Sequence, residues 1–451
     1  MPEISEEINQ QRLQEVNEAL GSGMFVAVRK LLQNMPPYDI SLILESSPIK
    51  TRSVLWQLID PDNHGEVLEE LNESVRKGIL KSMRPEKLAA VAEGMDVDDL
   101  AEVLRTLPDS VYREVLNSMD SQDRARVETA LSFDEDTAGG IMNTDTITLR
   151  PDVSVDVVLR YLRLKGELPD ATDSFYVVNR HDFFIGAVSL SSLVTAKPET
   201  SISSLINNDI QAIAADMEET AVAQLFERYD WLSAPVIDDS GRLLGRITID
   251  DVIDIIREDA EHTMMSMAGL DDEADTFAPV IKSTQQRSVW LGVNLITALL
   301  AVAVTSLFEG IFEQLAILAV LNSLVPSMGG VAGNQTLTLV IRGMALGHVG
   351  DSNSRALLTK ELAVGFLNGI IWAFLIATMV ALWKQDLMLG GVIAFAMLMN
   401  MTAAGLAGVL IPLGLKRMNI DPALAGTVLL TTITDVVGIF AFLGTATVLL
   451  T

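Results

Sequence analysis

The sequence has no cysteine among its 451 residues and only four histidines, five tryptophans and five tyrosines. The lack of cysteine excludes disulfides, cysteine-ligated zinc and thiol catalysis. With so few aromatic and histidine side chains, we expect neither stacking on nucleic-acid bases nor a histidine-rich metal site. Basic residues are also outnumbered, 32 Lys and Arg against 60 Asp and Glu, for a formal net charge of −28. This charge would repel a phosphate backbone, so we expect no nucleic-acid partner.

Charge is almost absent from the C-terminal part of the chain. Residues 276–451 carry seven acidic and eight basic side chains, whereas residues 1–275 carry 53 acidic and 24 basic ones. A chain of this length is expected to contain several domains, at roughly 100–200 residues each. We therefore expect an acidic soluble part followed by an apolar part in a different solvent.

The apolar part contains five long stretches with few or no charges. A membrane-spanning helix needs about 20 apolar residues, and the five stretches predict an α-helical membrane domain. The alternative interpretation is a set of buried helices in a large soluble core. The second stretch contains Pro326 and several glycines, so we expect it to be bent or locally unwound. The stretches are Ser288–Phe308, Gln314–Ile341, Leu362–Trp383, Leu387–Leu415 and Pro422–Thr451.

The basic residues of this part predict its orientation. Seven of the eight lie in segments on one side of the predicted spans, the side shared with the acidic part. By the positive-inside rule that side is cytoplasmic, and the C-terminus is predicted to lie outside. The N-terminal residues lack the basic region and apolar core of a signal peptide, so the first span is expected to direct insertion.

Two patterns divide the acidic part. Residues 4–131 predict short helices, because apolar residues recur at three- and four-residue spacing and prolines interrupt the pattern at short intervals. We expect a helical array, as in superhelical proteins. An internal repeat follows, with one copy from Ile141 to Leu193 and the other from Leu205 to Val252. Each copy predicts strand, helix, strand, turn, strand and helix.

Specific motifs carry a family resemblance. The repeats look like a tandem pair of CBS modules. The apolar part adds three motifs: the segment PSMGGVAGNQ from Pro326 to Gln335, the segment DPAL from Asp421 to Leu424, and the segment TDVVG from Thr434 to Gly438. From about residue 20 to its end, the chain resembles the MgtE family of magnesium transporters.

The resemblance implies a multidomain protein. The expected parts are an all-α helical array at 1–133, an α/β tandem CBS pair at 134–200 and 201–257, a linking (plug) helix at 250–280 and an α-helical membrane domain of five spans at 281–451. The resemblance also implies a homodimer whose pore follows the two-fold axis between the second and fifth spans. A bacterial inner membrane is the implied location.

Asp435 is the most informative residue of the last span. It lies roughly 20 Å along a helix that starts at Pro422, near mid-membrane, where an ionisable side chain is a functional-site hypothesis by default. Thr427 and Thr431 share its helix face. Magnesium is a hard cation that prefers oxygen ligands and loses its water reluctantly, so this face suits the hydrated ion. The alternative is a protonated aspartic acid that is hydrogen-bonded between helices.

The second span is expected to supply the other wall of the pore. Gly329 and Gly330 would allow close approach or exposed carbonyls, and Asn334 adds an amide oxygen. The alternative for the glycines is close helix packing. Glu361, Asn294 and Asn400 also lie in or near spans, and a structural pairing with a basic loop residue is an equal interpretation for Glu361.

An acidic stripe follows the second repeat. Carboxylates at four- and three-residue spacing repel one another on a helix unless something neutralises them. The resemblance implies that cytosolic Mg²⁺ does so, drawing the domains together and closing the pore; the alternative for each cluster is a solvated surface. The predicted regulatory residues are Asp96, Asp98, Asp99, Asp216, Glu218, Asp230, Asp250, Asp251, Asp254, Glu258, Asp259, Glu261 and Asp421.

The chain departs from the family pattern at several positions. It has His262 and Thr263 where acidic residues continue in the family, Val331 where asparagine is common, and Thr220 where an acid is expected, which leaves open whether gating is weakened. CBS modules often bind adenine nucleotides through a Thr-x-x-Asp motif. The second repeat has it at Thr248 and Asp251, so the resemblance implies at most one ATP site per chain.

The leading hypothesis is a Mg²⁺-selective channel or transporter, driven inward by the membrane potential and closed by cytosolic Mg²⁺. The alternative is an ion-coupled secondary carrier regulated by an adenine nucleotide at the CBS pair, and a third possibility is a membrane-anchored sensor that transports nothing. No catalytic constellation is visible, so we expect no enzyme. The residues leave selectivity among Mg²⁺, Co²⁺, Mn²⁺ and Ni²⁺ open.

Overall fold

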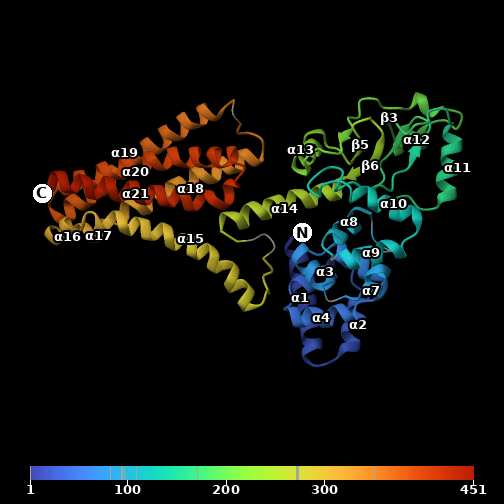
Figure 1. Ribbon diagram of the computed structural model, residues 1–451, viewed down its shortest axis with the longest axis horizontal. Coiled ribbons are helices and arrows are strands. Elements are labelled where there is room, and N and C mark those ends of the chain that lie inside the picture. Colours follow the sequence, from blue (N-terminus) through green and yellow to red (C-terminus); the bar gives the residue numbers. More distant parts are fainter. Residues whose placement is uncertain are drawn as a thin grey trace. The chain divides into compact units, whose positions relative to one another are not determined.

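The computed structural model describes residues 2–81, 83–92, 95, 97–107, 109–169, 171–270, 274–350 and 352–450. The chain forms two compact units: Met1–Ala260 with Glu273–Pro279, and Glu261–Asp272 with Val280–Thr451. Figure 1 follows the elements along the chain from the N-terminal helices to the apolar helices. Each unit is described below by itself.

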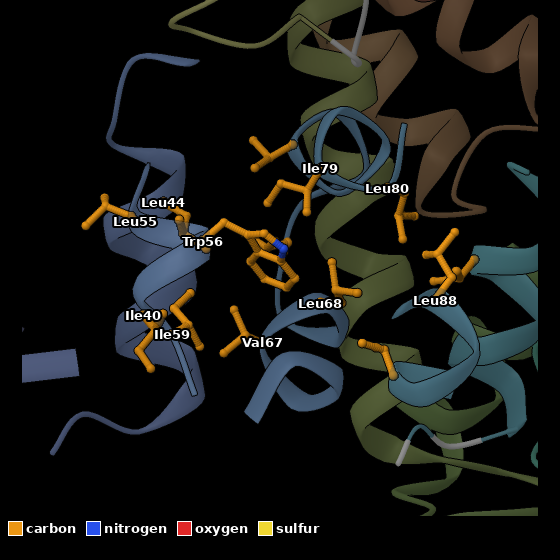
Figure 2. Packing of buried hydrophobic residues seen from close by; sticks show 14 of the residues in the cluster. Ile40, Leu44, Leu55, Trp56, Ile59, Val67, Leu68, Ile79, Leu80 and Leu88 are labelled. Carbon is orange, nitrogen blue, oxygen red and sulfur yellow. The ribbon is translucent and has the colours of Figure 1, made fainter. Parts of the chain in front are cut away.

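The first unit begins with the predicted helical array. Pro37 lies in the first turn of one helix and Pro48 directly precedes another, where a missing N–H costs nothing. Trp56 lies among Ile40, Leu44 and Val67 in the core (Figure 2). The helices are α1 (Pro2–Gly21), α2 (Phe25–Leu32), α3 (Pro37–Glu45), α4 (Ile49–Leu58), the 3₁₀ turn η1 (Pro61–Asn63), α5 (His64–Glu69), α6 (Glu73–Leu80), α7 (Pro85–Ala92), α8 (Val97–Arg105), α9 (Asp109–Ser118) and α10 (Ser121–Ala130).

The internal repeat folds into two sheets of three strands with the same topology. In each, the first and second strands are parallel and the second and third antiparallel. The first contains β1 (Thr148–Leu149), β2 (Ser174–Val178) and β3 (Phe184–Ser189), with α11 (Val155–Lys165) and α12 (Leu190–Thr195). After the 3₁₀ turn η2 (Ile202–Ser204), the second contains β4 (Ile213–Ala214), α13 (Glu219–Tyr229), β5 (Ser233–Ile237) and β6 (Leu243–Thr248).

Equivalent glycines explain the repeat at the atomic level. Gly186 pairs with Val177, and Gly245 pairs with Val236. A Cβ at Gly186 would stand 2.7 Å from the carbonyl oxygen of Asn207, and one at Gly245 would stand 2.6 Å from that of Asn143. Only glycine lets the backbone of a neighbouring segment pass this close to each third strand.

The linking helix is α14 (Ile249–Met267), which ends well before the predicted position 280. Gly269 has a positive φ of 69°. The N–H of Gly269 donates to the carbonyl of Ser266, and that of Leu270 to the carbonyl of Met265. These two bonds form a Schellman motif, which terminates the helix. A Cβ at Gly269 would also overlap the indole of Trp290.

The second unit contains five helices long and apolar enough to cross a membrane, as predicted. The span centred on α20 is the most enclosed, with 61% of its most apolar window buried, whereas α15 has no buried residue. The helices are α15 (Val280–Ser306), α16 (Glu309–Gln314), α17 (Ile317–Leu321), α18 (Leu324–Ala345), α19 (Ser354–Lys384), α20 (Leu387–Arg417) and α21 (Pro422–Leu450).

The second predicted span is interrupted, as expected, but its interruptions do not lie at the glycines. The helix α18 continues without a break from Leu324 to Ala345, and the interruptions of this span lie earlier, between α16, α17 and α18. Pro326 is in the first turn of α18, where an N–H has no acceptor within the helix and its loss breaks nothing.

Candidate ion pathway and acidic clusters

One face of α21 presents oxygen atoms that the rest of the chain does not cover. Thr427 and Asp435 are partly exposed and Thr431 is exposed. The Thr431 hydroxyl donates to the carbonyl oxygen of Thr427 at 2.9 Å, which leaves its lone pairs outward. Within the described part of the chain, Asp435 makes no hydrogen bond or ion pair. Its surroundings therefore favour a carboxylate that meets a ligand over an acid that is hydrogen-bonded to a neighbouring helix.

The helix α18 has a second uncovered polar face. Ser327, Asn334 and Thr338 recur along this face with the apolar Val331 between them, and all four are exposed, as is Gln335. Amide and hydroxyl groups are costly against lipid, where nothing satisfies their hydrogen bonds. The face therefore requires water or polar protein beside it.

The two predicted pore glycines have different surroundings. A Cβ at Gly330 would meet nothing closer than the hydroxyl oxygen of Thr434 at 3.9 Å, so this residue lies where α18 faces α21. Gly329 is buried, and a Cβ there would stand 2.1 Å from Nδ2 of Asn400. The structure thus puts Gly329 on the packed side of α18, in agreement with the alternative interpretation of close helix packing.

Glu361 is a buried carboxylate with partners on both oxygens. Its side chain accepts a hydrogen bond from the hydroxyl of Thr336 at 3.0 Å, and Lys360 Nζ lies 2.8 Å from its other oxygen. Only 3% of the residue is exposed. Structural pairing was one of the two interpretations of Glu361, but the role of Thr336 was missed because no local spacing connects α18 with α19.

Asp251, at the start of α14, is both a predicted regulatory residue and part of the predicted nucleotide site. Both the N–H and the hydroxyl of Thr248 donate to Asp251 Oδ2, at 3.2 and 2.8 Å. The Thr-x-x-Asp motif therefore forms a helix-capping arrangement. Burial, and secondarily the charge of Asp250, raises the pKa of Asp251 to about 6 despite the hydrogen bonds from Thr248.

An acidic cluster surrounds the first turns of α14. Burial raises the pKa of Asp99 well above its usual range, and repulsion from Glu69, Asp251 and Glu102 adds to the effect. Burial likewise raises the pKa of Glu258, with a further contribution from Glu102. Arg76, which pairs with Glu102, offsets only part of this charge. The helical array and the linking helix thus bring together carboxylates that repel one another.

A second acidic cluster lies around Glu219 at the start of α13. Burial, followed by the charges of Asp136, Glu258 and Asp259, raises the pKa of Glu219 to about 7. Sequence analysis selected the neighbouring Glu218, which is exposed. Asp136, Glu69 and Glu102 were missed because they are distant in the chain from α14, and only the fold brings their charges near it.

Several other predicted regulatory residues are hydrogen-bonded, paired with a base, part of a helix end or simply exposed. Asp98 accepts a hydrogen bond from Asn143 Nδ2 at 3.3 Å, and Asp254 pairs with Arg257 at 3.0 Å. Asp230 has a left-handed conformation that ends α13. Asp216, Asp250, Asp259 and Glu261 are exposed, and Asp96 lies outside the described residues. Among the residues that the structure describes, no group of three or more acidic or histidine side chains is arranged to hold a metal ion.

The last turns of α14 belong to the second unit, together with the apolar helices. Met267 packs against a buried cluster that includes Leu337, Ile341 and Leu430 of α18 and α21. Asp421 accepts hydrogen bonds from the N–H groups of Ala423 and Leu424 at the start of α21, and His262 Nε2 lies 3.6 Å from it. His262 thus contacts a predicted regulatory residue.

Comparison with known proteins agrees with this division. Residues 322–445 match the model of a divalent cation transporter, MgtE, and residues 35–136 match that of the MgtE intracellular N domain. Residues 138–199 and 202–258 each match the CBS domain. The cytosolic domain of the Mg²⁺ channel MgtE, solved in complex with ATP, aligns with a TM-score of 0.50 and 30% identity, over 54% of this chain and 99% of that one.

Two relatives extend the sequence match across both units. The magnesium transporter MgtE of Enterococcus faecalis is 33% identical over 432 residues, which is 95% of each chain. The magnesium transporter MgtE of Thermus thermophilus is 31% identical over 328 residues, 72% of each chain. The matched segments place the helical array first, the CBS pair next and the multi-pass membrane part last. The chain belongs to the MgtE family of magnesium transporters.

Proposed function

We propose that this chain is a Mg²⁺-selective channel or transporter of a bacterial inner membrane, with its acidic part in the cytoplasm and its C-terminus outside. The observation that carries the proposal is the pair of uncovered polar faces on α18 and α21, with Asp435 unpartnered at mid-membrane depth. The excess of basic residues on the side of the acidic part supports the orientation.

The conducting form is a homodimer. The polar faces of α18 and α21 have no cover in the single chain, and α15 has no buried residue. Lipid suits α15 but not the polar faces, whose groups need water or polar protein. A two-fold arrangement of two chains provides water and polar protein beside these faces. It also puts two Asp435 carboxylates opposite one Mg²⁺. Thr427, Thr431, Asn334 and Gly330 line the same path, and the ion keeps most of its water shell.

The membrane potential drives the ion inward. Two positive charges gain about 4.6 kcal/mol per 100 mV, at roughly 2.3 kcal/mol per charge. This energy makes a coupling ion unnecessary. A pore of this kind would dissipate the gradient if it stayed open, so it requires a gate.

Cytosolic Mg²⁺ closes the gate through α14. Without the ion, the carboxylates around Asp99 and Glu219 repel those of α14, and with it, the clusters come together. The packing of Met267 against Leu337, Ile341 and Leu430 supports the linking helix as the mobile element at the pore. The two acidic clusters and Asp421 are the regulatory sites, and exposed carboxylates such as Asp216, Glu218 and Asp250 contribute to the local negative potential.

An adenine nucleotide is a second cytosolic ligand. The support is the Thr248–Asp251 pair together with the relative whose cytosolic domain was solved in complex with ATP. Because Asp251 also lies beside Asp99, bound nucleotide and bound Mg²⁺ would influence each other at this carboxylate.

Flux through the purified chain in proteoliposomes tests the transport function. We expect Mg²⁺ uptake that follows an imposed potential, and we expect Asp435→Ala to abolish it while the protein elutes as the wild type does in size-exclusion chromatography. Wild-type flux in Asp435→Ala would refute the pore assignment. Uptake that survives collapse of the potential but follows a proton gradient would favour the coupled carrier instead.

Patch recording with cytosolic Mg²⁺ varied tests the gate. We expect open probability to fall as the cytosolic concentration rises. An open probability independent of cytosolic Mg²⁺ would contradict the sensor.

A further inference from the structure

Asn400, at the middle of α20, joins three helices of the membrane part. It is completely buried, and its Nδ2 donates to the carbonyl oxygen of Val325 in the first turn of α18 at 2.8 Å. On the other side, a Cβ at Gly438 of α21 would stand 2.8 Å from the same nitrogen. The amide therefore lies between the start of α18 and the second half of α21.

Two glycines of the family-like motifs make room for this side chain. A Cβ at Gly329 would stand 2.1 Å from Nδ2 and 2.7 Å from Cγ of Asn400, and one at Gly438 would stand 3.2 Å from the backbone nitrogen of Pro326. No side chain larger than hydrogen fits at either position unless the asparagine moves. Both glycines thus act by admitting Asn400.

The contact lies at the depth of the proposed pore carboxylate. Gly438 follows Asp435 by one turn of α21, about 5 Å along the helix. At the same level, a Cβ at Gly330 of α18 would stand 3.9 Å from the hydroxyl oxygen of Thr434 of α21. A change in the spacing of α18 and α21 at Asn400 would therefore move Asp435 relative to the polar face of α18.

Packing alone does not account for an asparagine here. Its Oδ1 is buried and has no hydrogen-bond partner among the residues that the structure describes. Burying an amide oxygen without a partner costs free energy, whereas leucine, of similar shape, would carry no such penalty. The hydrogen bond from the amide to the carbonyl oxygen of Val325 offsets this penalty. It also holds α20 and α18 in one of the several arrangements that apolar contacts would allow.

We propose that Asn400 is a positioning residue of the ion pathway: its amide holds α18 and α21 at the spacing that lets Asp435 select hydrated Mg²⁺ over other divalent cations. This role rests on the proposed transport function, but the spacing itself is measurable without transport. A polar group held by a hydrogen bond resists small displacements that a smooth apolar contact permits.

Cross-linking measures the spacing. The chain has no cysteine, so the pair Gly330→Cys and Thr434→Cys supplies the only thiols, at positions that face each other across α18 and α21. Disulfide formation is followed as loss of maleimide-reactive thiol in the full chain in nanodiscs. We expect Asn400→Leu to change the rate several-fold. Met401→Leu, at the next buried position of α20, is the matched control and should leave the rate unchanged.

Flux measures the consequence in the cysteine-free chain. We expect Asn400→Leu to lower the ratio of initial Mg²⁺ uptake to Mn²⁺ uptake by about fivefold, the factor that corresponds to about 1 kcal/mol. Inactive protein adds to neither rate, so a loss of folded protein alone cannot change the ratio. If Asn400→Leu does not fold, Gly329→Ala with Asn400→Ala refills the space without the hydrogen bond, and the same changes are expected.

The outcomes separate this proposal from the transport function. An unchanged cross-linking rate, or an unchanged cation ratio in a protein that takes up Mg²⁺, overturns the role of Asn400. If the wild type carries no Mg²⁺, the transport function fails, and if Asp435→Ala carries it normally, the pore assignment fails; in either case the cross-linking rate alone decides whether Asn400 sets the spacing.

Discussion

At the scale of single residues, Asp435 and Glu361 are two carboxylates of the membrane part with opposite surroundings. Glu361 is 3% exposed and has Thr336 and Lys360 as partners. Asp435 is partly exposed and makes no such contact in the described part of the chain. A carboxylate with satisfied oxygens stabilises the helices around it, whereas for Asp435 we propose a role in binding the ion.

The buried Thr336 hydroxyl provides a test of the structural carboxylate. We expect Thr336→Val to lower the free energy of unfolding by about 1.5–3 kcal/mol, because a hydrogen bond to a charged group is lost at a buried position. The thermal midpoint of the detergent-solubilised full chain is the measurement. Thr338→Val, on the exposed face of the same helix, should change it little, and equal effects of the two variants would contradict the assignment.

At the scale of elements, α14 differs from the other helices because it belongs to both compact units. Ile249–Ala260 lies in the first unit and Glu261–Met267 in the second. Its first part carries the carboxylates that meet the acidic clusters, and its last turn packs on α18 and α21 through Met267. A helix transmits a displacement at one end to the other, provided that its middle stays folded.

Proteolysis of α14 tests whether Mg²⁺ stabilises it. Arg257 is an exposed tryptic site near the middle of the helix. We expect Mg²⁺ to protect the bond after Arg257, because neutralised carboxylates allow α14 to stay docked and folded. The measurement is the rate at which the full chain in nanodiscs loses this bond with Mg²⁺ or with EDTA. Asp435→Ala is the control and should keep the protection, and equal cleavage in both conditions would rule out the linkage.

At the scale of the whole molecule, the raised pKa values make stability depend on pH. Asp251, with an ordinary pKa of 3.8, reaches about 6, and Glu219, with one of 4.5, reaches about 7. Between the unfolded and folded pKa values, the folded chain holds protons that the unfolded chain has lost. Stability must then fall as pH rises through this interval.

This pH dependence gives a prediction for the full chain in nanodiscs. With EDTA, we expect the first thermal transition, followed by tryptophan fluorescence, to move to lower temperature as pH rises from about 4.5 to about 7. Mg²⁺ should flatten the decline, because it binds the deprotonated carboxylates and removes their repulsion. Glu219→Gln should reduce the slope with EDTA. The same slope with and without Mg²⁺ would refute a metal site in these clusters.

The sequence by itself determined the order of the parts and the helix face that carries Asp435. The uneven distribution of charge, the runs of apolar residues and the repeated strand pattern are local properties, and local spacing is enough to predict spans, repeats and residues that share a face. The same reasoning did not locate the end of α14 or the interruptions of the second span, because both depend on helix-terminal hydrogen bonds rather than on composition.

Only the tertiary structure decided which groups meet. It brought Asp99 and Glu219 near the carboxylates of α14, directed Gly329 toward Asn400 instead of the open face, and gave Glu361 its partner in Thr336. These contacts join residues far apart in the chain, so no periodicity records them. Burial and the charges of distant neighbours, which set the pKa values, arise only once the helices are packed.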